Sequence, residues 1–249
     1  MALMTDCSLS MDSVGFSWGG RVALQSISFT PPQNQITVVT GPAGCGKSTL
    51  LRLLATLESD YRGAIRTGGR ELLTLTRTEL VAWRRQIGVM LNPLGNFDWL
   101  TAEGCLEFVI AHAGHKGLGG ERAVATLSSV GLEWARGRFP HEMSGGMQKR
   151  LALARALVLS PRMLILDDPT AGLDPVTGRE ILDLIAGLRG SASIVLATSD
   201  TANVRRLADH VLFLVEGRGH FFGANEAFQK SDDPYIRQFL ESRTEGPIS

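Results

Sequence analysis

A glycine-rich stretch, GPAGCGKST, occupies Gly41–Thr49 and limits the folds that this chain can adopt. It follows the apolar run QITVVT at Gln35–Thr40 and opens the helical pattern STLLRLLATL. A buried strand, a glycine-rich turn and a helix in direct succession are typical of a phosphate-binding loop in an α/β core. A glycine-rich turn with a chance lysine is the alternative interpretation. The stretch therefore predicts a phosphate site at a strand-to-helix junction.

Each residue type in this P-loop has a physical role. Glycines let backbone N–H groups point inward around phosphate oxygens, and the helix N-terminus adds its partial positive charge. Lys47 can reach the β- and γ-phosphates, and Ser48 can ligate Mg²⁺. Cys45 stands at a permissive position and is expected to have no catalytic role. The predicted ATP-binding residues of the loop are Gly41, Pro42, Ala43, Gly44, Cys45, Gly46, Lys47, Ser48 and Thr49.

Two adjacent acids follow another apolar run in the segment LILDDPTAGLD. Asp167 ends a predicted strand, which is where a carboxylate that holds Mg²⁺ opposite the P-loop is expected. Asp168 then faces the γ-phosphate side, where it can polarise an attacking water. A solvated pair of acids is the alternative. The sequence thus predicts ATP and Mg²⁺ as cofactors, with Lys47 and Asp168 as catalytic residues.

Apolar patterning predicts how the rest of the chain is organised. Leu9–Trp18 and Ala23–Phe29 alternate as half-buried antiparallel strands do. Between about Thr101 and Leu159 the patterns are helical, with residues 114–120 as a flexible connection, which predicts a helical subdomain inserted into a parallel α/β core. Apolar runs typical of strands covered on both faces recur at Ile87–Leu91, Met163–Asp167, Ser193–Thr198 and His210–Val215.

Composition excludes several classes of protein. The 249 residues hold 25 Lys+Arg and 25 Asp+Glu, so no positive excess favours nucleic acid. Cys7, Cys45 and Cys105 are too scattered for a disulfide framework or a zinc cluster. The start of the chain lacks the pattern of a signal peptide, and no run approaches the ~20 apolar residues of a spanning helix. We expect a protein that is soluble, or peripheral to a membrane through a partner.

A third motif, MSGGMQKRLALARAL at Met143–Leu157, lies between the P-loop and the two acids. A serine and two glycines before a helix form a second potential phosphate-binding helix N-terminus. The three motifs in this order resemble the nucleotide-binding subunit of ABC transporters over nearly the whole chain. The resemblance implies an α/β fold with a P-loop NTPase core, a mixed sheet, an antiparallel β subdomain and an inserted helical subdomain. It implies one domain, 1–249, with the core and β subdomain at 1–100 and 160–230, the helical subdomain at 101–159 and a tail at 231–249.

The resemblance also implies roles for residues outside the P-loop. Trp18 falls where an aromatic side chain stacks on adenine, with Phe16 as a rival and core packing as the alternative. Asp174 resembles the residue that communicates between two sites across a dimer. The signature turn binds the γ-phosphate of ATP held by a second subunit, so that one chain cannot complete a site; it comprises Ser144, Gly145 and Gly146.

The segment 93–108 implies a membrane partner. It carries Leu94, Phe97 and Trp99, which a loop would otherwise expose. In the family this region receives a coupling helix of the integral-membrane permease; a small satellite core is the alternative. Such a subunit lies at the cytoplasmic face of the bacterial inner membrane.

The signature SGGM and the ending SDDPYIRQFLESRTEGPI are similar to the ATPase subunits of Mla-type systems. Those systems move phospholipids with an Mce-domain protein, and a small STAS-type subunit is a further implied partner. We expect a short helix at Pro234–Glu241 followed by an extended polar segment that reaches the partner subunit.

Three positions that face the γ-phosphate depart from the family pattern. Asn92 replaces a glutamine that contacts Mg²⁺, Asp168 replaces a glutamate that acts as the base, and Ser199 replaces a histidine that hydrogen-bonds the phosphate. Each change shortens the reach of the side chain, and a misplacement of ~1 Å can lower a rate by about 10²-fold. The sequence therefore predicts sound ATP binding and impaired hydrolysis, with Ser199 as the third catalytic position and Asn92 as a metal ligand.

The sequence is compatible with two kinds of dimer and with one other class of function. A homodimer would be a slow lipid transporter with two weakened sites, whereas a heterodimer would hold one weakened and one sound site. A regulatory module that dimerises on ATP, like FtsE-type division ATPases, belongs to a different class. We favour the homodimeric transporter and expect no nucleic-acid partner.

Overall fold

The computed structural model describes residues 8–93, 95–114 and 119–248. Its larger sheet has six strands in the order β10-β9-β3-β8-β7-β6. Neighbours from β9 to β6 pair in parallel, and β10 pairs antiparallel with β9, so the sheet is mixed. The strands are β3 (Ile36–Thr40), β6 (Ile87–Met90), β7 (Met163–Asp167), β8 (Ser193–Ala197), β9 (His210–Val215) and β10 (Arg218–Ala224).

The parallel strands are covered on both faces, as their apolar sequences predict. Every residue of β3, β7 and β8 is buried. Alternate side chains enter two cores: Leu164 packs with helices α5 (Gly145–Leu157), α6 and α7, whereas Ile165 packs with α1 and the second sheet. The covering helices are α1 (Lys47–Leu54), α6 (Pro175–Ala186) and α7 (Thr201–Leu207).

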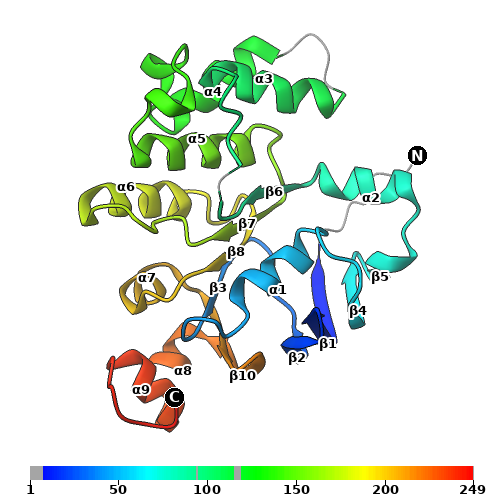
Figure 1. Ribbon diagram of the computed structural model, residues 1–249, viewed down its shortest axis with the longest axis vertical. Helices are drawn as coiled ribbons and strands as arrows, with labels where there is room; N and C mark the ends of the chain where they lie inside the picture. The colour runs from blue at the N-terminus through cyan, green and yellow to red at the C-terminus, as the bar shows by residue number, and fades with distance from the viewer. Residues whose placement is uncertain (1–7, 94, 115–118, 249) are drawn as a thin grey trace.

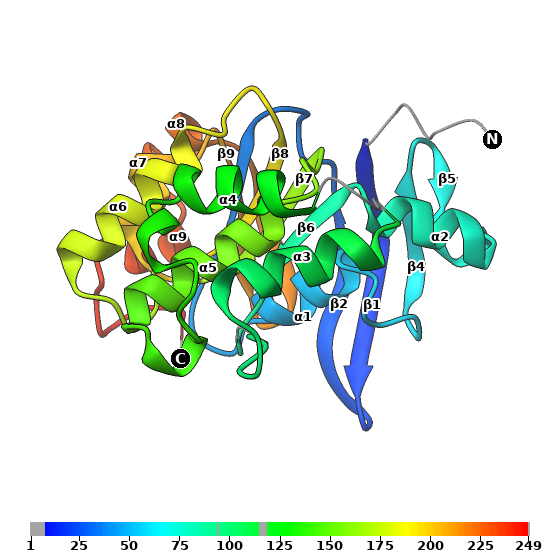
Figure 2. The ribbon, with the colours of Figure 1, turned by 90° about the horizontal axis from the view of Figure 1, so that it is seen from above.

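The second sheet is antiparallel, with the order β2-β1-β4-β5. Figures 1 and 2 place it, together with helix α2, on the side away from α6 and α7. The first two strands were predicted, although the second begins before Ala23. Strands β4 and β5 were not predicted, because they are short and charged and lack a clear alternating pattern. The elements are β1 (Leu9–Trp18), β2 (Arg21–Phe29), β4 (Arg62–Thr67), β5 (Arg70–Glu71), the turn η1 (Leu72–Thr74) and α2 (Arg77–Arg84).

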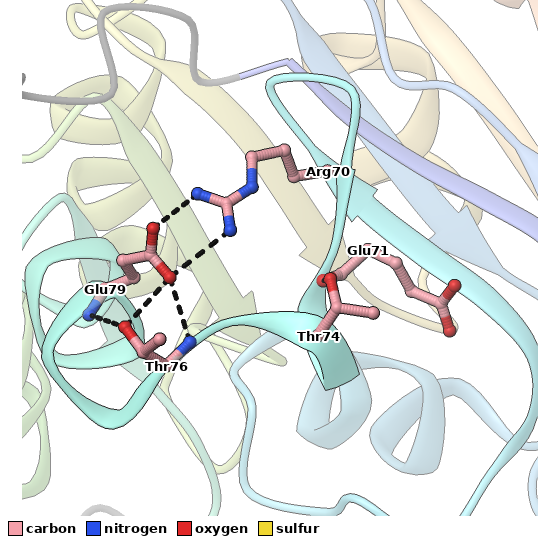
Figure 3. A network of polar contacts seen from close by, with 5 residues as sticks. All are labelled: Arg70, Glu71, Thr74, Thr76 and Glu79. Atoms are coloured by element: carbon pink, nitrogen blue, oxygen red, sulfur yellow. Dashed lines mark hydrogen bonds and ion pairs between the residues drawn. The ribbon is translucent and has the colours of Figure 1, made fainter.

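A capping network fixes the start of α2 against β5 (Figure 3). The Thr76 hydroxyl accepts from the backbone N–H of Glu79, and the Glu79 carboxylate accepts from the Thr76 backbone N–H at 2.9 Å. Arg70 donates to the same carboxylate at 2.5 Å. These contacts lower the pKa of Glu79 to about 2, with the Arg70 hydrogen bond as the largest cause. The network therefore ties strand β5 to helix α2.

A cluster of helices is inserted between β6 and β7, which confirms the predicted helical subdomain. In Figure 1 these helices gather at the end of the molecule opposite α8 (Asn225–Gln229) and α9 (Pro234–Leu240). Residues 115–118 of the predicted connection lie outside the described residues, as does Leu94. The inserted elements are α3 (Ala102–His112), α4 (Gly119–Ser129), the turns η2 (Glu133–Ala135) and η3 (Pro140–Glu142), and α5 (Gly145–Leu157).

The C-terminal segment corrects one prediction. Helix α9 (Pro234–Leu240) follows α8 (Asn225–Gln229), but residues 241–248 do not extend away from it. The Gln238 side chain accepts from the Ile248 backbone N–H at 2.7 Å and donates to the Ile248 carbonyl at 3.1 Å. Gln238 is buried, so its amide needs partners, and the returning chain satisfies it. The tail is therefore folded back on its own helix.

Candidate nucleotide-binding site

The P-loop joins β3 to α1, as its sequence predicts. Gly46 is the N-cap of α1 with a φ of 106°, and Gly41 has a φ of 144°. A Cβ on Gly46 would lie 2.8 Å from the Ala23 carbonyl, and one on Gly41 would overlap the carbonyl oxygen of Leu214. Because only glycine fits these two places, the loop can curl tightly with its N–H groups turned inward.

Lys47 begins helix α1 and lies over the loop. Its Nζ donates to the carbonyl oxygens of Gly41 and Pro42, each at 2.8 Å. Cys45 Sγ is 3.7 Å from the same ammonium, but the Cys45 side chain is buried and its burial raises the pKa of the thiol. A buried neutral thiol is a poor nucleophile, which fits the inert role expected of Cys45.

A cavity of about 690 Å³ opens beside the P-loop and is lined by Lys47, Ser48 and Thr49. This volume is in the range of small-molecule sites. Trp18 lines the same cavity and donates from Nε1 to Thr49 Oγ1 at 3.2 Å, whereas its rival Phe16 is buried in the core. Trp18 is 45% exposed, so of the two rings it is the one that can offer a face to a ligand.

Asp167 and Asp168 lie at the carboxyl end of β7. The Ser48 hydroxyl donates a hydrogen bond to Asp167, but burial dominates and raises the pKa of that carboxyl. Burial also raises the pKa of Asp168, as does the negative charge of Asp167. The positive charges of Lys149 and Lys47 oppose both shifts only in part. A divalent cation fits this place, because hydroxyl and carboxylate oxygens are the ligands that Mg²⁺ prefers and its charge would offset the crowding of two acids.

Asn92 follows β6, and both ends of its amide contact protein atoms. Nδ2 donates to the Asp167 carbonyl at 2.9 Å, and Oδ1 accepts from Lys149 Nζ at 3.1 Å. Asn92 thus lies against the end of β7, beside Asp167 and Asp168. The sequence pattern also groups it with these acids. Sequence reasoning missed Lys149, which belongs to α5 and is buried. The only signal for it in the sequence was the position of this lysine just before the apolar residues of the helix.

Ser199 follows β8, the other neighbour of β7 in the sheet. Its hydroxyl donates to the Gly41 carbonyl at 3.3 Å, which brings it to the first residue of the P-loop. Strands β6, β7 and β8 are adjacent and parallel, so their carboxyl ends meet at one edge of the sheet. The fold therefore gathers Asn92, Asp168 and Ser199 at the edge that also holds Lys47.

The signature turn does not line the cavity beside Lys47. Ser144 caps helix α5 by accepting from the Met147 N–H at 3.3 Å. Both Ser144 and Gly145 are exposed. Asp174 caps α6 with two backbone hydrogen bonds of 3.0 Å, and hydrogen bonds with Thr177 are the largest cause that lowers its pKa. The turn thus offers an exposed helix N-terminus outside the chain's own P-loop cavity.

The arrangement of a P-loop, a strand-end acid pair and a mixed sheet defines a P-loop nucleotide-binding ATPase. Residues 24–171 match the family model described as "ABC transporter". The chain is 31% identical to the intermembrane phospholipid transport system ATP-binding protein MlaF of Escherichia coli, over 96% of this chain and 91% of that protein. The chain belongs to the ABC transporter family, as an ATP-binding ATPase subunit.

Two further comparisons support this assignment. The chloroplastic protein TRIGALACTOSYLDIACYLGLYCEROL 3 of Arabidopsis thaliana is 31% identical over 98% of this chain and 76% of its own length. A solved dimeric structure of the ATP-binding cassette MJ0796, in a post-hydrolysis state with ADP and Pi, superposes with a TM-score of 0.78. It is 28% identical to this chain and covers 87% of it and 98% of the cassette. The expected ABC ATPase fold is confirmed.

Proposed function

We propose that this chain is the ATPase subunit of a membrane complex that moves phospholipids. The similarity to MlaF across nearly the whole chain carries the proposal, because the relative's name specifies phospholipid transport. The retained nucleotide-binding residues support it, since transport of this kind needs an ATP-driven subunit. Figure 1 shows helices α3, α4 and α5 together at one end of the molecule.

Mg²⁺-bound ATP is the proposed ligand of the cavity beside the P-loop. The loop N–H groups and Lys47 would bind the phosphates, and Trp18 would stack on the base. Ser48 and Asp167 would hold the metal, which supplies charge neutralisation at the phosphates when bound. Asp168 would accept a proton from the attacking water. For Asn92 to contact the metal, its Oδ1 would have to leave Lys149 Nζ, with which it is hydrogen-bonded at 3.1 Å.

A second subunit is required to complete the site. The exposed signature turn at 144–146 lies away from its own P-loop cavity, and the MJ0796 cassette is dimeric. We propose a homodimer in which each signature turn faces the other subunit's ATP, with Asp174 near the contact. A heterodimer is the alternative, in which this chain would hold the weakened site and its signature turn would complete a site on a different subunit.

A membrane permease is the proposed partner of the segment 93–108. Trp99 is 71% exposed there, whereas Phe97 packs against the core under Arg155. Nearby, a cavity of about 450 Å³ is lined by Leu57, Arg84, Val109 and Arg155. An exposed tryptophan next to a part-apolar hollow suits a short partner helix. None of the helices in the described ranges could cross a membrane. We therefore propose peripheral attachment at the cytoplasmic face of the inner membrane, with Mce-domain and STAS-type subunits in the same complex.

Hydrolysis by this chain is proposed to be slow. Asn92, Asp168 and Ser199 lie at the sheet edge beside the P-loop, where the γ-phosphate would bind, and the residues expected to bind nucleotide are all present. The test begins with the purified chain: Mg²⁺-dependent phosphate release that disappears in Lys47→Ala supports a homodimeric ATPase. ATP binding without any release would favour the heterodimer.

The lipid part of the proposal needs the assembled complex in proteoliposomes. We expect a fluorescent phospholipid to move when ATP and Mg²⁺ are supplied to the wild-type complex and not when Lys47 is replaced by Ala. A complex that hydrolyses ATP but moves no phospholipid would refute lipid transport and leave the ATPase assignment intact.

A further inference from the structure

Lys149 is a buried cation that the proposed chemistry does not use. It lies in the second turn of α5 and is 7% exposed. Its Nζ donates to Asn92 Oδ1 at 3.1 Å and to the Asp168 carbonyl at 3.3 Å. Burying an ammonium is costly unless hydrogen bonds replace its water. These two contacts, together with the negative charges of Asp168 and Asp167, make the buried position of Lys149 tolerable.

The backbone of Asp168 needs such support. Its φ is 44°, in the left-handed region that non-glycine residues seldom adopt. Its N–H donates to the Ala197 carbonyl at 2.9 Å, and its carbonyl accepts from the Ala171 N–H at 3.1 Å as well as from Lys149. A strained conformation persists only where its surroundings hold it in place. Of these three contacts to the Asp168 backbone, only the one from Lys149 is made by a charged group.

Asn92 is held by the same cation from the other side. Its Nδ2 is bonded to the Asp167 carbonyl, so the contact between Oδ1 and Lys149 completes the hydrogen bonding of the amide. The segment 93–108, where we place the permease contact, begins at the next residue. Lys149 thus connects helix α5, the start of that segment and the backbone of Asp168 through atoms that touch directly.

We propose that Lys149 is a positioning residue, which holds the Asp168 backbone and the Asn92 side chain in one arrangement and transmits movement of the helical subdomain to both. The proposal rests on the assignment of Asp168 as the base of an ATPase. Lys149 does not touch the phosphate in this scheme. Its effect is expected on the rate of hydrolysis and not on the affinity for ATP.

The matched pair of variants is Lys149→Met and Arg150→Met in the purified chain. Arg150 is the neighbouring cation on α5 and donates to the Val130 carbonyl and to Glu180, away from the acids. We expect Lys149→Met to lower kcat by about 10-fold with the Kd for ATP changed by less than about twofold. Arg150→Met should lower Tm without this selective loss, and Lys149→Arg should recover part of the rate.

Amide hydrogen exchange provides a readout that is independent of hydrolysis. Without the Lys149 contact, we expect the turn at 168–171 and the segment after Asn92 to exchange faster, with unchanged exchange in strand β9. Equal losses of kcat in both methionine variants, or unchanged exchange at 168–171 in Lys149→Met, would overturn the positioning role. If the purified wild-type chain releases no phosphate, as expected of the heterodimer, the exchange experiment still tests the contact, and unchanged exchange at 168–171 in Lys149→Met still overturns the positioning role.

Discussion

Lengthening Asp168 to glutamate is the substitution that most directly tests the cause proposed for slow hydrolysis. The backbone at this residue cannot advance toward the phosphate, because its N–H is bonded to Ala197 and its carbonyl to Lys149. The reach of the carboxylate is therefore set by the side chain. Asp168→Glu adds one carbon–carbon bond of about 1.5 Å, which is comparable to the ~1 Å displacement that can change a rate by about 10²-fold. We expect kcat to rise by between about 10-fold and 10²-fold.

The assay is steady-state phosphate release with saturating ATP and Mg²⁺, together with a binding isotherm for ATP. Affinity should stay within about twofold, because the base contributes to the transition state and little to binding. Ser199→His in the same chain should add a further gain, since it restores a donor that a short hydroxyl bonded to Gly41 cannot supply. Asp183→Glu is the control, because Asp183 is on α6 and pairs with Arg206.

The reasoning fails if the folded single and double variants all hydrolyse ATP at the wild-type rate. A gain of similar size in Asp183→Glu would also refute it, because the effect would then not depend on reach at the γ-phosphate. Thermal melts on each protein distinguish these results from a loss of folded chain.

Three further predictions follow from other parts of the molecule. Gly41→Ala should abolish ATP binding in an equilibrium titration, because its Cβ would overlap the Leu214 carbonyl; a folded variant with normal affinity would contradict the loop geometry. Trp18→Ala should weaken ATP binding by roughly 10-fold, the loss expected for one stacked base, and an unchanged Kd would argue against stacking. Glu79→Gln should lower Tm at neutral pH. Because the pKa of Glu79 is lowered from 4.5 to about 2 by Arg70 first, its contribution is full above 4.5 and is lost as the pH falls toward about 2. The Tm difference from wild type should therefore vanish across that window, and a difference that persists at pH 2 would disprove the carboxylate network.

The sequence was sufficient to predict the parallel strands and the P-loop. Continuous apolar runs such as Met163–Asp167 have one stable environment, a strand covered on both faces, so their position in the core follows from composition alone. Strand β4 escaped prediction because its register depends on β1, a partner more than fifty residues away in places, and β5 escaped because it is only two residues long and pairs with β4. Long-range pairing of short polar strands leaves little local signal.

The positions of candidate site residues could be predicted where a residue follows a strand, but not where helices meet the sheet. Asn92, Asp168 and Ser199 each follow a buried run, so the shared edge of the sheet could be inferred. Lys149 could not be placed, because its partners Asn92 and Asp168 follow β6 and β7, and no spacing along α5 encodes them. The returning tail is a similar case: the bonds between Gln238 and Ile248 depend on a buried amide that the sequence pattern does not reveal.

The contacts of Ser199 suggest why a short residue is compatible with an intact P-loop. The Gly41 carbonyl accepts from both Lys47 and Ser199. When the Lys47 ammonium turns toward a phosphate, this carbonyl would lose one partner, and a part-buried carbonyl without a partner is unfavourable by about 1–3 kcal/mol. The Ser199 hydroxyl keeps it bonded. A histidine at this position would exchange that support for a contact with the phosphate, so Ser199→His should raise hydrolysis and slightly destabilise the nucleotide-free chain. A variant that gains both rate and nucleotide-free Tm would show that the serine has no such supporting role.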